Sequence, residues 1–494
     1  MKNILTFLSI FILFSACGKL EDLNKNTKDP SAVPGESLFT YAQKKLCDQM
    51  TTPNVNYNIF RLITQQWTET TYTDESNYDL VTRTIPDLHW NRLYRDVLKN
   101  FNEAAKVVTA TTYLANEDPS VKQNKLAVIE ILTVYTYSVL VQTFGNIPYT
   151  EALDLSKPLP KYDDGLTVYK DLMVRLNTAI ATLNSATSNE SFGAADNIYQ
   201  GDVTLWIKFA NSLKLKMGMV LADVDNATAK TAIEEAAPNV FSSNDDNAKL
   251  VYLSASPNTN PVYVELVASG RHDFVPTSTL VGKMNKLNDP RRYFFFTQID
   301  TSTTKTVKLA FVGGTNGASN DYYANSHIAD ALNKPTFPAA FIDYSEIEFL
   351  LAEAVERGFT VGGTAEDHYN NGIEASILDW GTTDARYASF ATQAAIDAYL
   401  ANPDVAYTTA VGDYKQIIGT QAWIALYNRG FEAWTQWRRL DYPVLVAPAD
   451  AVSDVPVRYI FPIQEQTLNG ANYKAASEAI GGDFVTTKLF WDKY

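Results

Sequence analysis

The sequence predicts a mostly α-helical fold built from helix hairpins, with one loop-rich irregular region that carries a few short strands. Three observations support this prediction: helical spacing of apolar residues along most of the chain, a segment with the form of a helix pair, and a change of composition between residues 240 and 340. A chain of 494 residues is long enough to bury a sizeable core in one large domain or in two or three smaller ones.

Apolar residues recur at spacings of three and four, which is the pattern of helices that bury one face. The most apolar of these stretches is "LAVIEILTVYTYSVLVQTF" at 126–144, which carries Glu130 and Gln142. We therefore expect a buried helix there and not a membrane span. The predicted helices cover 37–50, 57–69, 87–109, 122–144, 166–183, 202–222, 341–357, 364–380, 392–400 and 414–438.

One helix pair is marked most clearly by its turn. "FIDYSEIEFLLAEAVERG" ends at Gly358, and a second helix follows with Thr364 as N-cap and Asp367 three residues later. The pair has the size of a tetratricopeptide unit, about 34 residues. Repeated pairs of this kind stack into a curved scaffold, although the sequence shows no strict repeat.

Between residues 240 and 340 the helical pattern gives way to Asn, Ser, Gly and Pro with short apolar stretches. This composition is typical of edge strands and long loops. Long loops inside a helical chain usually carry function. We therefore expect this region to form part of a ligand-facing side.

The N-terminus has the build of a bacterial lipoprotein signal. Lys2 precedes the apolar run "NILTFLSIFILFSA", which contains no acidic residue, and Ser15 and Ala16 stand directly before Cys17. We expect residues 1–16 to be removed and the Cys17 thiol to carry a diacylglyceryl group. The alternatives are an ordinary signal peptide or a buried apolar N-terminus with an incidental cysteine.

Residues 17–35 form the expected tether, and residues 36–494 the expected binding domain. Glu21 and Asp22 follow the cysteine closely, either as part of a solvated linker or as a sorting tag for the outside of the outer membrane. Membrane attachment would then rest on the lipid alone.

Charge and cysteine count exclude several classes of protein. The formal net charge is −15, and it becomes −16 when residues 1–16 are removed with Lys2. No basic stripe is present, so we expect no nucleic-acid partner. With Cys17 acylated, Cys47 is the only remaining thiol, and the core must hold the fold without an intramolecular disulfide.

The sequence lacks the common catalytic motifs. It contains no H-E-x-x-H, G-x-S-x-G, G-x-x-x-x-G-K-[ST] or C-x-x-C, although a carboxylate pair of the glycosidase kind would leave no such signature. The oxygen-rich "DESNYD" at 74–79 lacks the spacing and glycine of a calcium loop. We predict no catalytic residue, metal or cofactor, and structural roles for the scattered histidines His89, His272, His327 and His368.

Aromatic residues are the positive signal, with 28 Tyr, 24 Phe and 8 Trp. Most have helical spacing and belong to the core, but four tyrosines stand among polar loop residues. A flat ring beside polar groups can cover the apolar face of a sugar while its neighbours bond the hydroxyls, and the same surface also suits a peptide. Plain loop packing is the alternative for each tyrosine. The candidate ligand-binding residues are Tyr72, Tyr78, Arg271, Asn316, Asp321, Tyr322 and Tyr323.

Seven segments in order resemble the SusD/RagB family, in particular its SusD-like nutrient-binding outer-membrane lipoproteins. The resemblance covers nearly all of the chain after residue 16. The segments are "CGKLEDLNKNTKDPSAVP", "QQWTETTYTD", "FGNIPYTEAL", "LNDPRRYFF", "FIDYSEIEFLLAEAVERG", "FEAWTQWRRLDYP" and "RYIFPIQEQTLN".

The resemblance implies a SusD-like fold and a lipid-anchored, cell-surface protein seated on a SusC-like TonB-dependent transporter. It also implies a nutrient ligand, commonly an oligosaccharide and in some members a peptide. A surface hydrolase and a non-catalytic envelope scaffold are the competing functions. In "WRRLDYP" we expect Arg438 and Arg439 to form ion pairs within the fold, near Glu432 and Asp441.

Overall fold

The computed structural model describes residues 33–112, 118–303 and 306–494. The predicted signal peptide at 1–16, the acylation site Cys17 and most of the 17–35 tether lie outside the described residues.

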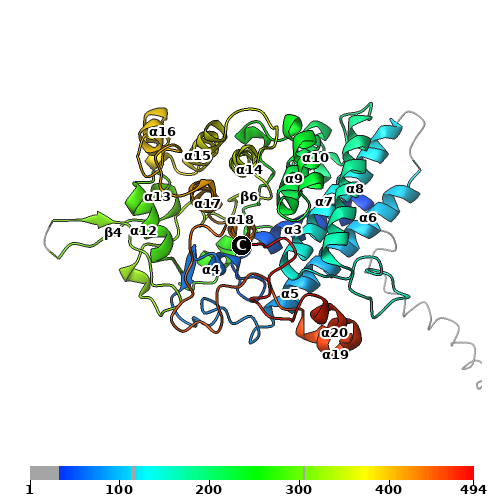
Figure 1. The fold of residues 1–494 in the computed structure, drawn as a ribbon, viewed down its shortest axis with the longest axis horizontal. Coiled ribbons are helices and arrows are strands. Elements are labelled where there is room, and N and C mark those ends of the chain that lie inside the picture. The colour runs from blue at the N-terminus through cyan, green and yellow to red at the C-terminus, as the bar shows by residue number, and fades with distance from the viewer. Residues whose placement is uncertain (1–32, 113–117, 304–305) are drawn as a thin grey trace, which may run out of the picture.

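Helices make up most of the described chain, as predicted (Figure 1). A seven-residue π-helical segment, Arg92–Leu98, joins α5 to α6 without a break. The helices are α3 (Gly35–Thr51), α4 (Phe60–Ile63), α5 (Ile85–Asn91), α6 (Lys99–Ala110), α7 (Pro119–Phe144), α8 (Gly165–Asn184), α9 (Val203–Leu221), α10 (Asn226–Ala236), α11 (Pro261–Tyr263), α12 (Ser278–Leu287), α13 (Arg292–Phe295), α14 (Tyr344–Glu356), α15 (Ala365–Gly381), α16 (Gln393–Leu400), α17 (Tyr414–Ala425), α18 (Gly430–Leu440), α19 (Ile463–Leu468) and α20 (Gly470–Ala479).

The strands are short and form three separate antiparallel pairs. Five of the six strands fall between residues 240 and 340, where the sequence predicts them. The pairs are β1 (Trp67–Glu69) with β3 (Phe274–Pro276), β2 (Lys249–Leu250) with β6 (Ala339–Ala340), and β4 (Ile299–Asp300) with β5 (Leu309–Ala310).

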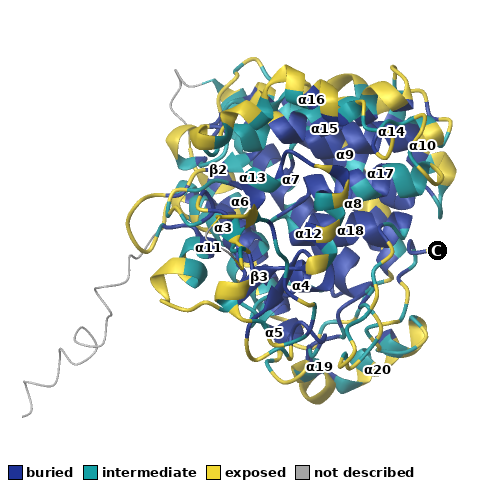
Figure 2. Cartoon of the chain, turned by 90° about the vertical axis from the view of Figure 1, so that its left-hand side faces the viewer, coloured by how far each residue is buried: buried dark blue, intermediate teal, exposed yellow. Residues whose placement is uncertain are grey.

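The helices stack as a row of hairpins. Helix α7 packs on α8, α8 on α9, α9 on α10 and α14, and α14 on α15. In Figure 1 this row starts with α6–α10 on the right and continues along the upper edge to α14, α15 and α16. Buried residues fill the helices in the interior, and exposed residues lie mainly on outer faces and loops (Figure 2).

Helix α7 has the length and apolar character of a membrane span, but it is a core helix. In its most apolar window, 83% of the residues are buried inside the fold. The prediction of a buried helix at 126–144 is therefore confirmed.

The turn between α14 and α15 confirms the sequence-based helix boundary. Gly358 has a φ of 79° after α14, a conformation that glycine adopts without strain. Thr364 Oγ1 accepts a hydrogen bond from the Asp367 amide at 3.1 Å, and the Asp367 carboxylate accepts one from the Thr364 amide at 3.2 Å. This is the reciprocal capping box that the sequence predicts.

Two predicted helices are wrong in part. In the stretch 57–69 only four residues are helical, because Gln65 at a φ of 52° turns the chain into β1. Pairing of β1 with β3 then overrides the local helical spacing. The predicted helix 414–438 is two helices, since Asn428 at a φ of 67° breaks it between α17 and α18.

Candidate functional site

An open hollow of about 580 Å³ lies where three loops meet. The loops follow β1, precede β3 and lead into the short 3₁₀ turn Tyr322–Ala324. The lining residues are Thr70, Thr71, Tyr72, Arg271, His272, Asp273, Asn320, Asp321, Tyr322 and Tyr323. We call this the three-loop hollow.

Backbone hydrogen bonds join the three loops. The Thr70 amide donates to Asp273 O at 2.9 Å, and the Thr70 hydroxyl donates to His272 O at 2.6 Å. On the other side the Asn320 amide donates to Thr70 O at 2.9 Å, and its side chain donates to Glu69 O at 3.0 Å. The hollow is therefore built on a fixed backbone, with Thr70 at its centre.

Gly317 lets the third loop pack closely on the first. Its φ is 70°, and a Cβ at this position would lie 2.4 Å from Pro448 Cβ and 2.6 Å from Asn77 Oδ1. The carbonyl of Gly317 accepts a hydrogen bond from Asn77 Nδ2 at 2.8 Å. A larger side chain would push the loop away and open the hollow.

Aromatic rings form one wall of the hollow. The Tyr322 ring is stacked between His272, at a centroid distance of 4.1 Å, and His327, at 3.8 Å. Tyr323 stands edge-on to Tyr322 at 5.4 Å and is 74% exposed. Tyr72, on the loop after β1, is 70% exposed. Burial lowers the pKa of His327, so its ring is neutral at pH 7.

The charged groups of the hollow are held in defined positions. Arg271 Nε lies 2.6 Å from Asp273 Oδ2, and this pairing raises the pKa of Arg271. Asp321 caps the 3₁₀ turn, where its Oδ1 accepts a hydrogen bond from the Tyr323 amide at 2.9 Å. Both carboxylates line the hollow, and Arg271 is more than half exposed.

The chain matches a family model described as "Starch-binding associating with outer membrane" over residues 26–462. It belongs to this SusD-like family. The resemblance found in the sequence is thereby confirmed.

Solved structures show the same fold as this SusD-like protein. A chitin-binding protein is 28% identical with a TM-score of 0.79, and the match covers 93% of this chain and 100% of that one. A SusD homolog from Bacteroides uniformis is 25% identical, with a TM-score of 0.76 and coverage of 92% and 99%. A chitin-binding SusD homolog from Flavobacterium johnsoniae is 22% identical, with a TM-score of 0.74 and coverage of 92% and 97%. Among curated proteins nothing matches the chain.

Five of the seven candidate ligand-binding residues of the SusD-like protein meet in the three-loop hollow. They come from segments about 200 and 50 positions apart in sequence, which the β1–β3 pairing and the loop hydrogen bonds bring together. The five residues are Tyr72, Arg271, Asp321, Tyr322 and Tyr323.

The other two candidates, Tyr78 and Asn316, do not line the hollow. Tyr78 is 1% exposed, and its hydroxyl accepts a hydrogen bond from Gln65 Nε2 at 3.1 Å. Asn316 lies against Tyr78, with both polar atoms of its amide buried. Tyr78 is therefore packed within the fold, which is the alternative stated for the tyrosines, and its ring belongs to the hydrophobic core.

His272 lines the hollow, although the sequence analysis assigned it a structural role, whereas His327 does not line the hollow and stacks on Tyr322. His272 directly follows Arg271, which the sequence analysis chose as a candidate ligand-binding residue, and this adjacency could have pointed to it. The other two histidines are structural as expected. His89 is fully buried against Gln49, and His368 pairs with Glu348 at 2.7 Å.

The oxygen-rich segment 74–79 is used within the fold. Asp79 accepts hydrogen bonds from the Val81 and Thr82 amides at 2.8 and 3.0 Å, and Glu75 pairs with Arg83. In the part of the chain that the structure describes, no group of three or more His, Cys, Asp or Glu residues is arranged to hold a metal ion.

A buried acid pair supports the loop after β1. Glu69 is 4% exposed and Glu75 is 1% exposed. Glu69 Oε2 accepts hydrogen bonds from the Ser76 amide and hydroxyl, both at 2.9 Å. Burial, together with the neighbouring Glu75, raises the pKa of Glu69, so that it holds a proton at neutral pH.

The arginines of "WRRLDYP" act within the fold, with partners other than those expected. Arg439 pairs with Glu353 through two contacts of 2.8 and 2.7 Å. Arg438 forms no ion pair among the described residues. Its guanidinium lies over the rings of Trp434 and Trp491, at 3.5 and 4.6 Å from their centroids, and donates to Gln142 O at 2.6 Å.

Proposed function

We propose that this chain is a surface-exposed outer-membrane lipoprotein that binds a neutral oligosaccharide in the three-loop hollow and passes it, unaltered, to a SusC-like TonB-dependent transporter. The observation that carries the ligand proposal is the presence of two exposed tyrosine rings, Tyr72 and Tyr323, in one hollow with hydrogen-bonding side chains.

The chemistry of the hollow suits a sugar. A pyranose ring has an apolar face of C–H groups and an edge of hydroxyls, so it needs an aromatic surface beside donors and acceptors. The exposed rings supply the surface. Arg271 supplies donors, Asp273 and Asp321 supply acceptors, and Asn320 lines the hollow beside them. A volume of about 580 Å³ has room for more than one sugar ring.

The relatives support a glycan ligand. The family is described as starch-binding, and the 28% identical structure is named a chitin-binding protein. Starch and chitin are both neutral polymers of glucose-type rings. In the hollow Arg271 pairs with Asp273, and Asp321 accepts a hydrogen bond from the Tyr323 amide.

Contacts in the hollow support a binding role over a catalytic one. Glycosidases need two carboxyl groups free to act on the scissile bond. Here Asp273 is held by Arg271, and Asp321 caps a turn. Glu69 is buried, and its Oε2 accepts hydrogen bonds from the Ser76 amide and hydroxyl. A hydrolase with this hollow as its active site would have to break these contacts first.

The lipid anchor and the transporter partnership rest on the sequence and the family. Cys17→Ala should release the mature chain into the soluble fraction or leave it unprocessed, with Cys47→Ala as the matched control that stays in the membrane. Mild detergent extraction should recover the wild type with a TonB-dependent barrel in about equal amounts. Recovery of the chain alone from membranes that contain the barrel would contradict the partnership.

The ligand proposal is tested by calorimetric titration of the domain that follows residue 32. The probes are chitotetraose, maltohexaose and an uncharged tetrapeptide of matched length. Saturable binding of at least one oligosaccharide, and no binding of the peptide, is the expected result. Binding of the peptide alone would replace the glycan proposal with the peptide alternative.

A further inference from the structure

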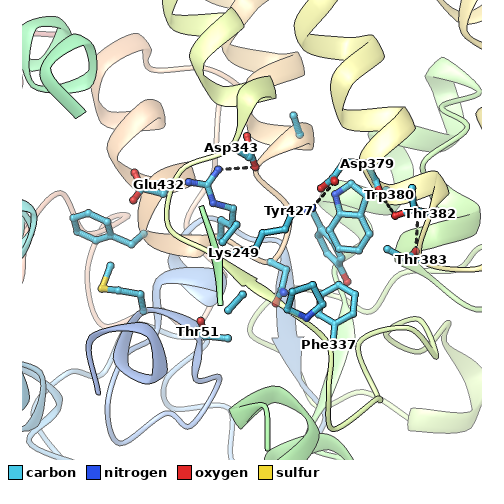
Figure 3. A pocket seen from close by; sticks show the side chains of 18 of the residues that line it. Thr51, Lys249, Phe337, Asp343, Asp379, Trp380, Thr382, Thr383, Tyr427 and Glu432 are labelled. Atoms are coloured by element: carbon cyan, nitrogen blue, oxygen red, sulfur yellow. Dashed lines mark hydrogen bonds and ion pairs between the residues drawn. The ribbon is translucent and has the colours of Figure 1, made fainter. Parts of the chain in front are cut away.

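A second, more enclosed cavity lies in the centre of the fold, apart from the three-loop hollow. It has a volume of about 290 Å³ and shares no lining residue with the hollow. Its walls come from the ends of α3 and α15, from the β2–β6 pair and the loop before β6, and from the turn between α17 and α18 (Figure 3). We call it the central cavity.

Three aromatic rings form one side of the central cavity. Figure 3 shows Trp380, Tyr427 and Phe337 gathered on one side, opposite Glu432 and Thr51. The Trp380 centroid lies 5.7 Å from that of Tyr427 and 6.0 Å from that of Phe337. Phe295 packs edge-on against Trp380 at 4.7 Å. The indole is thus fixed in orientation before any ligand arrives.

Five of the six charged residues that line the cavity are in ion pairs, and the sixth, Lys334, donates to Thr383 O at 3.2 Å. Arg429 donates to Asp343 at 2.8 Å and to Glu346 at 2.6 Å, and Lys249 pairs with Asp379. Glu432 pairs with Lys216. A charged ligand would leave one of these groups without its partner, at a high cost in a site this enclosed. The wall therefore favours a neutral ligand.

One hydrogen-bond donor of the cavity wall has no partner among the described residues. Arg429 Nε is buried and has no hydrogen-bond partner among the described residues, although the same guanidinium makes three other contacts. The Arg429 side chain is only 10% exposed. An unpaired buried donor is costly, and a ligand oxygen that reaches it after a small shift of the side chain would satisfy it.

We propose that the central cavity binds a single neutral sugar ring, independently of the three-loop hollow. The ring's apolar face lies on Trp380, and one of its oxygens accepts from Arg429 Nε. The Asp379 carboxylate, which is about one-quarter exposed, accepts from a hydroxyl. The volume of about 290 Å³ lies at the lower end for small-molecule sites, so one ring fits and a chain does not.

The mouth of the cavity is polar and open to solvent. Lys334, Thr336 and Thr382 line the cavity and are exposed. A monosaccharide can therefore enter from outside without unfolding the core. Such a site would respond to the free sugar that accompanies an oligosaccharide, while the hollow responds to the oligosaccharide itself.

The test uses saturation-transfer NMR with free D-glucose and free N-acetyl-D-glucosamine as probes. It is carried out on Tyr72→Ala/Tyr323→Ala, so that the three-loop hollow is already weakened. The expected result is transfer to ring protons of at least one probe, saturating with a Kd of about 1–10 mM. Absence of saturable transfer for both probes overturns the proposal, whether or not the three-loop hollow binds oligosaccharides.

Two blocking variants assign the signal to the central cavity. In the same background, Ala340→Phe should fill the cavity from β6 and weaken binding at least about tenfold. Ala401→Phe, at an exposed position outside the cavity, is the matched control and should leave it unchanged. If Ala340→Phe fails to fold, Thr336→Trp blocks the exposed mouth instead. Transfer that survives the folded blocking variant overturns the proposal.

Discussion

Replacing Tyr323 by alanine separates ligand binding from fold stability. The ring is 74% exposed, and it lies edge-on to three other rings, at 5.4 Å from Tyr322, 5.8 Å from His272 and 6.5 Å from His327. Its removal therefore costs little packing, and we expect the free energy of unfolding to fall by less than about 1 kcal/mol. A stacked sugar would lose about 0.5–1.5 kcal/mol of binding, which is roughly a 2- to 13-fold rise in Kd.

Tyr72→Ala should behave in the same way, because that ring is 70% exposed. If the two rings contact different parts of the ligand, their losses add to about 1–3 kcal/mol in the double variant. Calorimetry with the tightest-binding oligosaccharide gives Kd, and urea denaturation of the same samples gives stability.

Tyr78→Ala is the matched control, since Tyr78 lies in the same stretch of sequence but is 1% exposed. Creating a cavity of this size in the core should cost about 3–5 kcal/mol of stability. Affinity per folded molecule should stay unchanged. The reasoning is refuted if both exposed tyrosines can be removed with less than a twofold change in Kd, or if their loss lowers stability as much as that of Tyr78.

Three further predictions concern buried titratable groups. The pKa of Glu69 is raised in the fold, so at pH 8 the unfolded chain loses a proton that the folded chain keeps, and this destabilises the fold. Glu69→Gln mimics the protonated acid and should therefore raise the melting temperature at pH 8 and not at pH 4.5. Equal gains at both pH values would argue against a protonated Glu69. Burial lowers the pKa of His89 to about 3 in the folded protein. The free energy of unfolding should therefore fall as the pH drops below the ordinary histidine pKa of the unfolded chain, by about 2 kcal/mol between pH 7 and 5. His89→Phe should remove that difference in urea denaturation, and a retained difference would assign it to other groups. Arg439→Met should cost about 3–5 kcal/mol by leaving Glu353 without one of its partners, whereas a loss below 1 kcal/mol would show that Arg357 alone suffices.

Much of the fold could be predicted from sequence because it depends on local periodicity. The apolar spacing at 126–144 and the Thr364 cap each specify their own helix, and the structure confirms both. The stretch 57–69 could not be predicted in this way. Its ending depends on Gln65 and on pairing with β3, about 200 residues further along the chain.

For the candidate site, the sequence analysis used one rule: a tyrosine that stands among polar loop residues is expected to be exposed. That rule selects Tyr72 and Tyr323, which are exposed, and it fails at Tyr78, whose ring is buried together with the neighbouring polar residues Glu75, Ser76 and Asn77. The central cavity gave no signal in the sequence. Its wall combines segments around residues 51, 249, 337, 380 and 429, and nothing local marks any of them as a ligand contact.

The central claim is that the chain binds a neutral oligosaccharide and leaves it intact. The most direct measurement is calorimetric titration with chitotetraose and maltohexaose, followed by mass spectrometry of the sugar recovered from the calorimeter after the titration. The account predicts saturable binding of at least one of them, weakened in Tyr72→Ala/Tyr323→Ala, with the sugar recovered at its original length. Recovery of shortened sugar, or equal affinity in the double variant, would contradict it.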